Sequence, residues 1–270
     1  MMRLFTKPSK AKTIIKYIFI GGLFISVASI GIVEYYTSNQ IREHKLSELD
    51  FKLWSHAGYV KDSLDGVKNS IQSFDKAQSL GAKGLEVDVI YDVSLKKFVV
   101  SHDFPYSRYD NKLLFLDSVF SKYQNNFVYW LDYKNLKDLK KEDVAESYER
   151  LEFIVQAQKL QKENVLIESV NVDNLSYFTD KGYYTSWWIN PYKSKYKSIL
   201  RNFKYRLYYT LGRYSSLSMR YTYYERVEEK LNNIPINLWT INDGDYYNSV
   251  KDNDRVKIIL TDNNWFTSKE

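Results

Sequence analysis

The chain contains no cysteine and little histidine or glycine: there are three His and 10 Gly in 270 residues. The absence of cysteine excludes disulfides, thiolate metal sites and anchoring through a lipidated cysteine. Glycine-rich phosphate loops of the G-x-G-x-x-G or G-x-x-x-x-G-K type are also absent, which argues against a nucleotide-binding open sheet. Because histidine is so scarce, a histidine beside acidic residues at the end of an apolar run is a candidate for chemistry.

Acidic residues are missing from the start of the chain. No Asp or Glu precedes Glu34, whereas five basic residues do: Arg3, Lys7, Lys10, Lys12 and Lys16. Five of the six net positive charges therefore lie in this tail, and residues 34–270 carry a net charge of only +1. A nearly neutral main part gives little support to nucleic-acid binding, so we expect no nucleic-acid partner.

A long apolar run follows the basic tail. Tyr17–Val33 carries no charge, and with Thr13–Ile15 and a snorkelling Lys16 it is long enough to cross about 30 Å of hydrocarbon as a helix. The preceding cations orient the N-terminus toward the cytoplasm and the rest of the chain outside it, in the periplasm or extracellular space. We predict four parts: a cytoplasmic tail (1–12), an uncleaved transmembrane signal anchor (13–36), a stalk or lead-in helix (37–50) and a catalytic domain (51–270).

A cleaved signal peptide is the competing interpretation of the same run. Ser26-Val27-Ala28 resembles a small-residue cleavage site. The apolar run continues beyond that site, which favours the uncleaved anchor. A mature N-terminus near residue 29 would overturn this preference.

Short apolar runs alternate with helix-periodic segments from residue 51 onward. Helical spacing is clearest in 67–81, where Ile71, Phe74 and Ala77 recur, and in 142–161. About eight such units predict an α/β fold, a (β/α)₈ TIM-type barrel, in preference to a doubly wound open sheet. The expected strands are 51–58, 84–92, 98–103, 127–133, 165–169, 183–189, 215–219, 236–242 and 256–262.

Polar residues gather at or near the ends of the first expected strands. His56 ends one strand, Glu86 and Asp88 lie two residues apart on the next, and His102 ends the run after it. Asp132 ends a further strand, with Lys134 two residues on. Since catalytic residues of such barrels project from the carboxyl ends of several strands, these groups are expected to converge on one mouth.

Three carboxylates suit a hard divalent cation, Mg²⁺ or Ca²⁺, and two flanking histidines suit general acid–base chemistry. Each signal has a simpler alternative. An E-x-D pair in a strand is more often a solvated face, and a lone histidine is more often structural. The order and spacing of these residues together favour a site.

The motifs SHAG, KNSIQSFDKAQSLGAKGLEVDV, FVVSHD, WLDYK, LWTIND and IILTDN occur in that order between residues 53 and 263. This succession resembles the glycerophosphodiester phosphodiesterases, within the PLC-like phosphodiesterases. The resemblance implies a catalytic pair, His56 and His102, and three metal ligands, Glu86, Asp88 and Asp132. It also implies substrate contacts from Lys134, Asn69 and Trp239.

Three positions depart from the family pattern. Ala57 stands where the family has the arginine of His-Arg-Gly, so the missing phosphate contact would fall to Lys134 or Arg108. Lys68 replaces the Glu of Glu-Asn-Thr. Asp132 is one methylene shorter than the usual Glu and is similar to the aspartate of the related phospholipase D toxins.

The resemblance implies a membrane-anchored, metal-dependent phosphodiesterase that hydrolyses glycerophosphodiesters or lysophospholipids by two-histidine acid–base catalysis. The departures at Ala57 and Lys68 leave an alternative: a redirected or inactive barrel that binds a phosphorylated headgroup or an envelope polymer. Turnover abolished by EDTA and by His56→Ala would favour the enzyme.

One further segment, 191–216, is basic and aromatic and contains no acid. On a chain tethered to a bilayer, this composition predicts a helix that contacts anionic headgroups at the membrane surface. The alternative is a solvated helix on the outer wall of the barrel with its tyrosines packed inward. Its seven cations are Lys193, Lys195, Lys197, Arg201, Lys204, Arg206 and Arg213.

Overall fold

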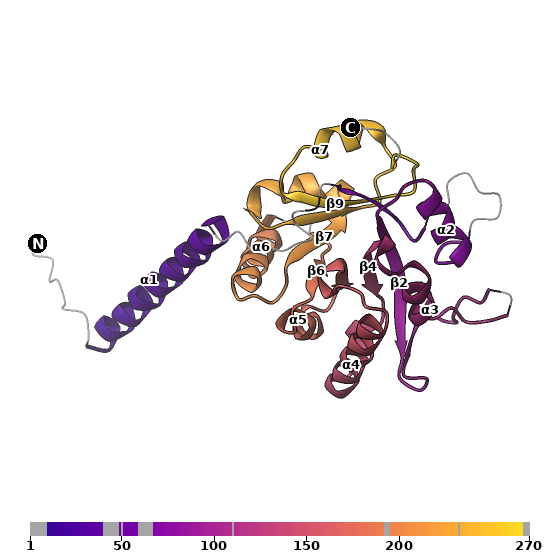
Figure 1. Cartoon of the computed structure of the whole chain (residues 1–270). Helices are drawn as coiled ribbons and strands as arrows, with labels where there is room; N and C mark the ends of the chain where they lie inside the picture. The colour runs from indigo at the N-terminus through magenta and orange to yellow at the C-terminus, as the bar shows by residue number, and fades with distance from the viewer. Residues whose placement is uncertain are drawn as a thin grey trace, which may run out of the picture.

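The computed structural model describes residues 10–39, 49, 51–58, 67–109, 111–191, 195–231 and 233–266. A long helix, α1, stands apart from a rounded body in which strands are surrounded by helices (Figure 1).

Eight parallel strands close into a barrel, which confirms the predicted TIM-type fold. The sheet order runs β1-β9-β8-β7-β6-β5-β4-β2, and β1 also pairs with β2, so the sheet has no open edge between them. The barrel strands are β1 Leu53–Ser55, β2 Gly84–Asp92, β4 Val128–Tyr133, β5 Val165–Ser169, β6 Tyr184–Trp188, β7 Ser216–Arg220, β8 Ile236–Trp239 and β9 Val256–Thr261.

The ninth expected strand is not a barrel strand. The sequence pattern counted 98–103 with the others, but β3 (Lys97–Val100) pairs antiparallel with β2. Only a short turn separates the two strands, far fewer residues than a parallel crossover needs. The Asp92 carboxylate fixes this turn by accepting hydrogen bonds from the Ser94 and Leu95 amides, both at 2.9 Å.

Helices cover the outside of the barrel between successive strands (Figure 1). The segments predicted from periodicity, 67–81 and 142–161, contain α2 and most of α4, and α2 begins after Ser70, whose side chain caps the Ser73 amide at 3.1 Å. The helices are α2 Ile71–Ser79, α3 Leu116–Tyr123, α4 Lys141–Ala157, α5 Val172–Asp180, α6 Lys195–Thr210 and α7 Gly244–Val250. Short 3₁₀ turns lie at Gln124–Asn126, Leu136–Asp138, Lys162–Asn164, Tyr221–Arg226 and Glu228–Lys230.

The core has two layers. A large cluster fills the space between strands and helices, while a smaller one fills the barrel interior with Trp54, Trp130, Leu166, Tyr184, Ile258 and Leu260. Gly84 is required beside this inner cluster, because a Cβ there would lie 2.2 Å from the Trp54 ring. Besides these apolar side chains, buried polar groups bond one another across neighbouring strands: the Asn237 amide donates to the Ser186 and Ser216 hydroxyls at 3.0 and 2.9 Å.

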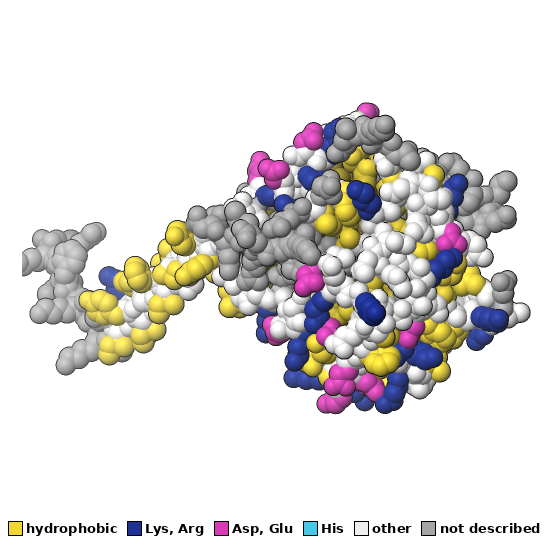
Figure 2. All heavy atoms as spheres, in the orientation of Figure 1, with side chains coloured by type: hydrophobic (Ala, Val, Ile, Leu, Met, Phe, Trp, Pro, Cys, Tyr) yellow, Lys and Arg dark blue, Asp and Glu magenta, His cyan; other side chains and the backbone are white. Residues whose placement is uncertain are grey.

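Helix α1 spans Lys10–Asn39 and contains the predicted 13–36 segment. Its stretch Ile14–Thr37 is long and apolar enough to cross a membrane, and its apolar side chains are almost all exposed (Figure 2). Helix α1 takes up the first residues of the predicted stalk, 37–50. The rest of that stalk lies outside the described residues except for Leu49.

Candidate active site

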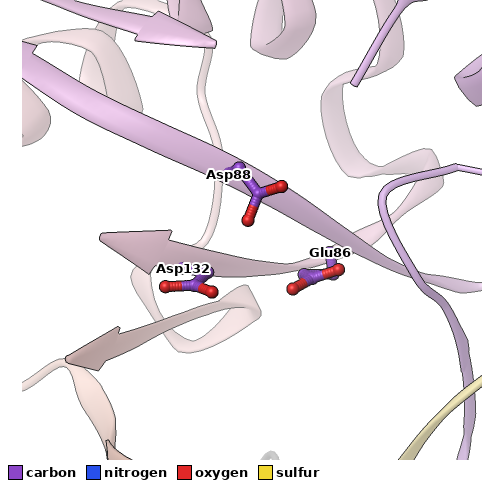
Figure 3. Close-up of side chains that lie close together, drawn as sticks. All are labelled: Glu86, Asp88 and Asp132. Carbon is purple, nitrogen blue, oxygen red and sulfur yellow. The ribbon is translucent and has the colours of Figure 1, made fainter. Parts of the chain in front are cut away.

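Three carboxylates meet at the carboxyl end of two neighbouring barrel strands. Glu86 and Asp88 share one face of β2, and Asp132 of β4 is the direct register partner of Asp88. One oxygen of each lies within 4.8 Å of the others (Figure 3). Residues 44 positions apart in the chain are therefore brought together by parallel strand pairing.

This carboxylate cluster is electrostatically costly. Burial raises the pKa of Glu86 well above its ordinary value, and the charges of Asp88 and Asp132 raise it further. Burial likewise raises the pKa of Asp132, although Lys134 opposes this effect. The Lys134 ammonium lies 2.7 Å from Asp88 Oδ1 and also bonds Asp132.

The cluster fits a hard cation. Its donors are all carboxylate oxygens, and the buried Glu86 Oε2 accepts no hydrogen bond from any described residue. A buried anionic oxygen without a donor is costly, and a bound divalent cation would satisfy it.

Asn69 positions one of these carboxylates. Its amide nitrogen donates to Asp88 Oδ2 at 2.5 Å, while its amide oxygen accepts from the Asp88 backbone at 2.9 Å. The side chain is buried behind Asp88 and is not on the cavity wall. In this position Asn69 supports Asp88, and its contact with a substrate stays a prediction.

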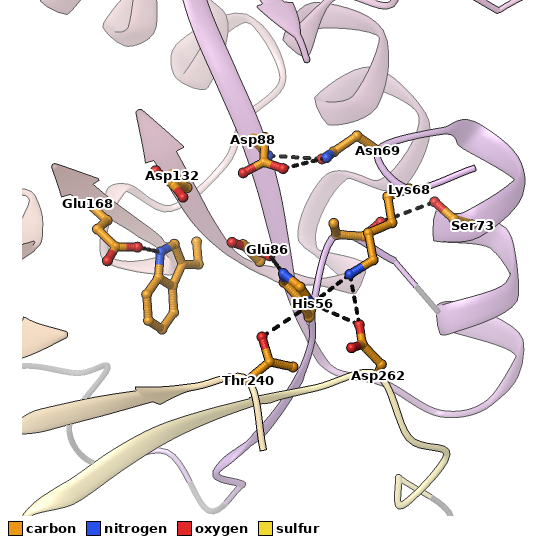
Figure 4. A network of polar contacts seen from close by, with 12 residues as sticks. His56, Lys68, Asn69, Ser73, Glu86, Asp88, Asp132, Glu168, Thr240 and Asp262 are labelled. Atoms are coloured by element: carbon orange, nitrogen blue, oxygen red, sulfur yellow. Dashed lines mark hydrogen bonds and ion pairs between the residues drawn. The ribbon is translucent and has the colours of Figure 1, made fainter. Parts of the chain in front are cut away.

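His56, just after β1, is held by a carboxylate that the sequence interpretation left without a role. Its Nδ1 lies 2.8 Å from Asp262 Oδ1, and Lys68 Nζ lies 3.1 Å from the same oxygen and 2.9 Å from Nδ1 (Figure 4). We assign the ring proton to Nδ1, which then donates to Asp262, and the Lys68 ammonium donates to Asp262 and not to the ring; Nε2 is left free to accept a proton. Nε2 points toward Glu86, with its Oε2 3.7 Å away.

The charge on Asp262 is well stabilised. Burial raises its pKa, but the hydrogen bond and charge of His56 outweigh burial, helped by Asn242 and Lys68, so the pKa lies well below its usual range. The final Thr-Asp motif was the available sequence signal for this residue.

His102 reaches the site by way of the β2–β3 hairpin. The Ser101 amide donates to the Asp88 carbonyl at 3.1 Å, so the returning strand brings the next residue back beside the carboxylates. His102 is exposed, and its Nδ1 lies 2.8 Å from Asp103 Oδ2. It lines the same cavity as His56.

The cavity has a volume of about 660 Å³, within the range of small-molecule sites. Glu86, Asp132 and Lys134 line it, and Trp239 and Trp188 form an aromatic wall with ring centroids 5.9 Å apart. Arg108 is not part of the cavity: its exposed side chain bonds the Asn111 carbonyl at 3.3 Å. Of the two cations expected to replace the missing arginine, Lys134 or Arg108, only Lys134 lines this cavity.

The sequence analysis did not single out Glu168 as a site residue. It is the last residue but one of β5, pairs in register with Asp132 and lines the cavity. Trp130 donates to it at 2.5 Å, and Ser218 also bonds it. Burial raises its pKa well above the ordinary value, and the charge of Asp132 adds to this effect. A single Glu inside an apolar run gave no pairing signal.

No protein-family model and no curated protein sequence matches the chain. Several solved structures do match the chain in fold. A glycerophosphodiester phosphodiesterase from Parabacteroides distasonis is 21% identical, with a TM-score of 0.56 over 78% of this chain and 92% of that one. A glycerophosphodiester phosphodiesterase from Agrobacterium tumefaciens is 13% identical, with a TM-score of 0.53 over 80% and 97% of the two chains.

The chain has the fold of these enzymes. A third neighbour, an Oleispira antarctica phosphodiesterase in complex with the product sn-glycerol-3-phosphate, is 14% identical with a TM-score of 0.53, over 78% of this chain and 92% of that one. The resemblance indicated by the motifs is thereby confirmed for the fold. The activity has to be argued from the residues of the site.

Proposed function

We propose that this protein is a metal-dependent phosphodiesterase that hydrolyses glycerophosphodiesters or lysophospholipids. The observation that carries the proposal is the carboxylate cluster of Glu86, Asp88 and Asp132, two of which (Glu86 and Asp132) line the cavity, with His56 Nε2 directed at Glu86. A structural neighbour binds sn-glycerol-3-phosphate as its product, which supports a phosphodiester substrate with a glycerol part.

His56 is the proposed general base. Asp262 holds its Nδ1 proton, so Nε2 accepts a proton from the attacking hydroxyl, which is either water or a neighbouring hydroxyl of the substrate. The oxygen that loses this proton forms a bond to phosphorus as the bond to the leaving alcohol breaks. His102, which lines the same cavity, then protonates the leaving alkoxide.

Two lysines provide fixed positive charge for the phosphodiester. Lys134 lies on the cavity wall among the carboxylates, and Lys68 lies behind His56. Glu86, Asp88 and Asp132 would hold one divalent cation, Mg²⁺ or Ca²⁺, which supplies neutralisation of charge on the phosphate oxygens when bound. Trp239 and Trp188 would contact the apolar part of the alcohol.

We further propose that α1 is an uncleaved signal anchor with its N-terminus in the cytoplasm. The acid-free tail and the exposed apolar surface of Ile14–Thr37 support this orientation and the crossing. The barrel then lies outside the cytoplasm, where it meets diesters at the envelope.

The test is turnover by the full chain in detergent. Glycerophosphocholine, glycerophosphoethanolamine and lysophosphatidylcholine are supplied with Mg²⁺ or Ca²⁺, and the released alcohol or glycerol phosphate is measured. We expect turnover that EDTA abolishes and that added cation restores. Binding of these ligands without turnover under any of the cations would refute the enzymatic proposal and favour a headgroup-binding barrel.

A further inference from the structure

Helix α6 has an inner face that is fully used by the barrel. Tyr205 and Tyr209 are buried, and the Tyr205 ring packs against Trp187 of β6 with centroids 5.1 Å apart. The interpretation of 191–216 as a helix with tyrosines packed inward therefore holds for this face. This packing does not account for the side chains on the outer face of α6.

The outer face of α6 is also apolar. Leu200, Phe203, Leu207 and Leu211 follow one another at steps of three, four and four residues, which places them on one side of the helix and just beyond its end. This stripe lies on a different side from Tyr205 and Tyr209. Leu200 is 75% exposed and Leu211 63% exposed, whereas Phe203 and Leu207 between them are half-buried. A surface helix ordinarily carries polar residues there.

The apolar helix α1 ends against α6 (Figure 1). Glu34 Oε2 lies 2.9 Å from Arg206 Nη1, and the Thr37 and Thr210 hydroxyls are 3.3 Å apart. Both contacts fall within one turn of each helix. The 19 residues before this junction, from Ile14 to Ile32, measure about 28 Å as a helix, close to the hydrocarbon thickness of a bilayer.

We propose that the outer stripe of α6 (Leu200, Phe203, Leu207 and Leu211) docks into the surface of the bilayer that α1 crosses. This inference rests on the proposed anchor and adds a second contact, which fixes how the barrel sits on the membrane. The junction at Glu34 and Thr37 puts α6 at the level where the span ends, so its exposed leucines meet the headgroup layer.

Charge plays a smaller part than the sequence indicated. Arg206 is paired with Glu34, and Arg213 lies 2.7 Å from Asp173, so two of the basic residues are already neutralised. We propose that burial of the apolar side chains contributes most of the binding free energy, so docking should persist on neutral lipid.

The experiment uses single cysteines in the full chain, which has none of its own. Spin labels are attached at Leu200→Cys and Leu211→Cys, at Phe24→Cys within α1, and at Phe153→Cys on α4 as the matched control. Phe153 is 61% exposed, close to the exposure of Leu211. Each labelled protein is reconstituted in phosphatidylcholine nanodiscs, and collision with oxygen and with a water-soluble nickel chelate is measured.

We expect the oxygen-to-nickel collision ratio at 200 and 211 to exceed that at 153 severalfold and to approach that at 24. A lipid-like ratio at 24 with water-like ratios at 200 and 211 would refute docking while leaving the anchor intact. A water-like ratio at 24 would refute the anchor and the docking with it. Shielding from both reagents with dipolar broadening at 200 would assign the stripe to a second copy of the chain and also refute membrane docking.

Discussion

Replacing Lys134 by methionine should destabilise the protein in a way that depends on pH. The ammonium lies 2.7 Å from Asp88, an attraction of about 6 kcal/mol at an effective dielectric of about 20. Desolvation of both groups cancels part of this energy. Removing one partner of such a buried pair typically costs about 3–5 kcal/mol, and the partial exposure of the Lys134 side chain puts the expected loss near 3 kcal/mol.

The pH dependence follows from the direction of the pKa shifts. Burial and neighbouring carboxylates raise the pKa of Glu86 in the folded protein, and burial chiefly raises that of Asp132; Lys134 lowers both. Without Lys134 both values rise further. At pH values below the pKa values of the unfolded chain, both carboxyls are protonated in the folded and in the unfolded state, so replacing Lys134 costs little stability. As the pH rises through the pKa values of the folded protein, the two carboxyls lose their protons in the folded state. The loss of stability caused by replacing Lys134 then reaches its full size.

The assay is urea unfolding of the full chain in detergent, followed by tryptophan fluorescence near pH 3 and near pH 8. Lys122→Met is the matched control, because Lys122 Nζ lies 2.7 Å from Asp75 in an exposed pair that contributes about 0–1 kcal/mol. A divalent cation should restore much of the stability of Lys134→Met at pH 8. An equal loss at both pH values, or a loss no larger than in Lys122→Met, would refute this account of the cluster.

The remaining predictions concern single side chains of the site. His56→Ala and His102→Ala should each lower turnover by about 10²- to 10⁴-fold, whereas His44→Ala, the third histidine, should leave kcat and KM unchanged. Asp262→Asn should lower kcat by about 10²-fold with little change in KM, because an amide does not hold the His56 Nδ1 proton as the carboxylate does. An unchanged pH–rate profile would contradict the role of Asp262 in positioning His56. Glu168→Gln should gain stability relative to the unaltered chain as the pH rises from 5 to 8, by about 1 kcal/mol or more in urea unfolding, because a carboxyl with a raised folded pKa loses its contribution over that range.

Most of the barrel could be predicted from the sequence because its strands are short apolar runs buried on both faces. The expected ranges 84–92 and 165–169 coincide with β2 and β5. Composition could not distinguish the run 98–103 from the parallel barrel strands, since a buried antiparallel strand has the same composition as a parallel one. The deciding feature was the length of the connection to β2.

The residues that the sequence missed act through partners far away in the chain. Glu168 becomes part of the site only because β5 aligns it with Asp132, and Asp262 only because β9 pairs with β1 beside His56. Spacing within one strand identified Glu86 with Asp88, because that geometry is local. Pairing between strands depends on register, which no local pattern carries.

The departures from the family pattern are explained together by the position of Lys68. Ala57 is buried, and its carbonyl oxygen accepts a hydrogen bond from the backbone N–H of Asn69 at 2.9 Å, so the turn after His56 is kept without an arginine. Lys68, where the family has an acid, brings an ammonium to His56 and Asp262 instead. Exchanging an acid for a base adds two positive charges and losing the arginine removes one, so the surroundings of His56 are more positive by one charge than in the family pattern. Lys134 lines the cavity but is engaged by two carboxylates, and Lys68 lies behind His56 and is engaged by Asp262, so either ammonium has to leave an acidic partner to contact a phosphate.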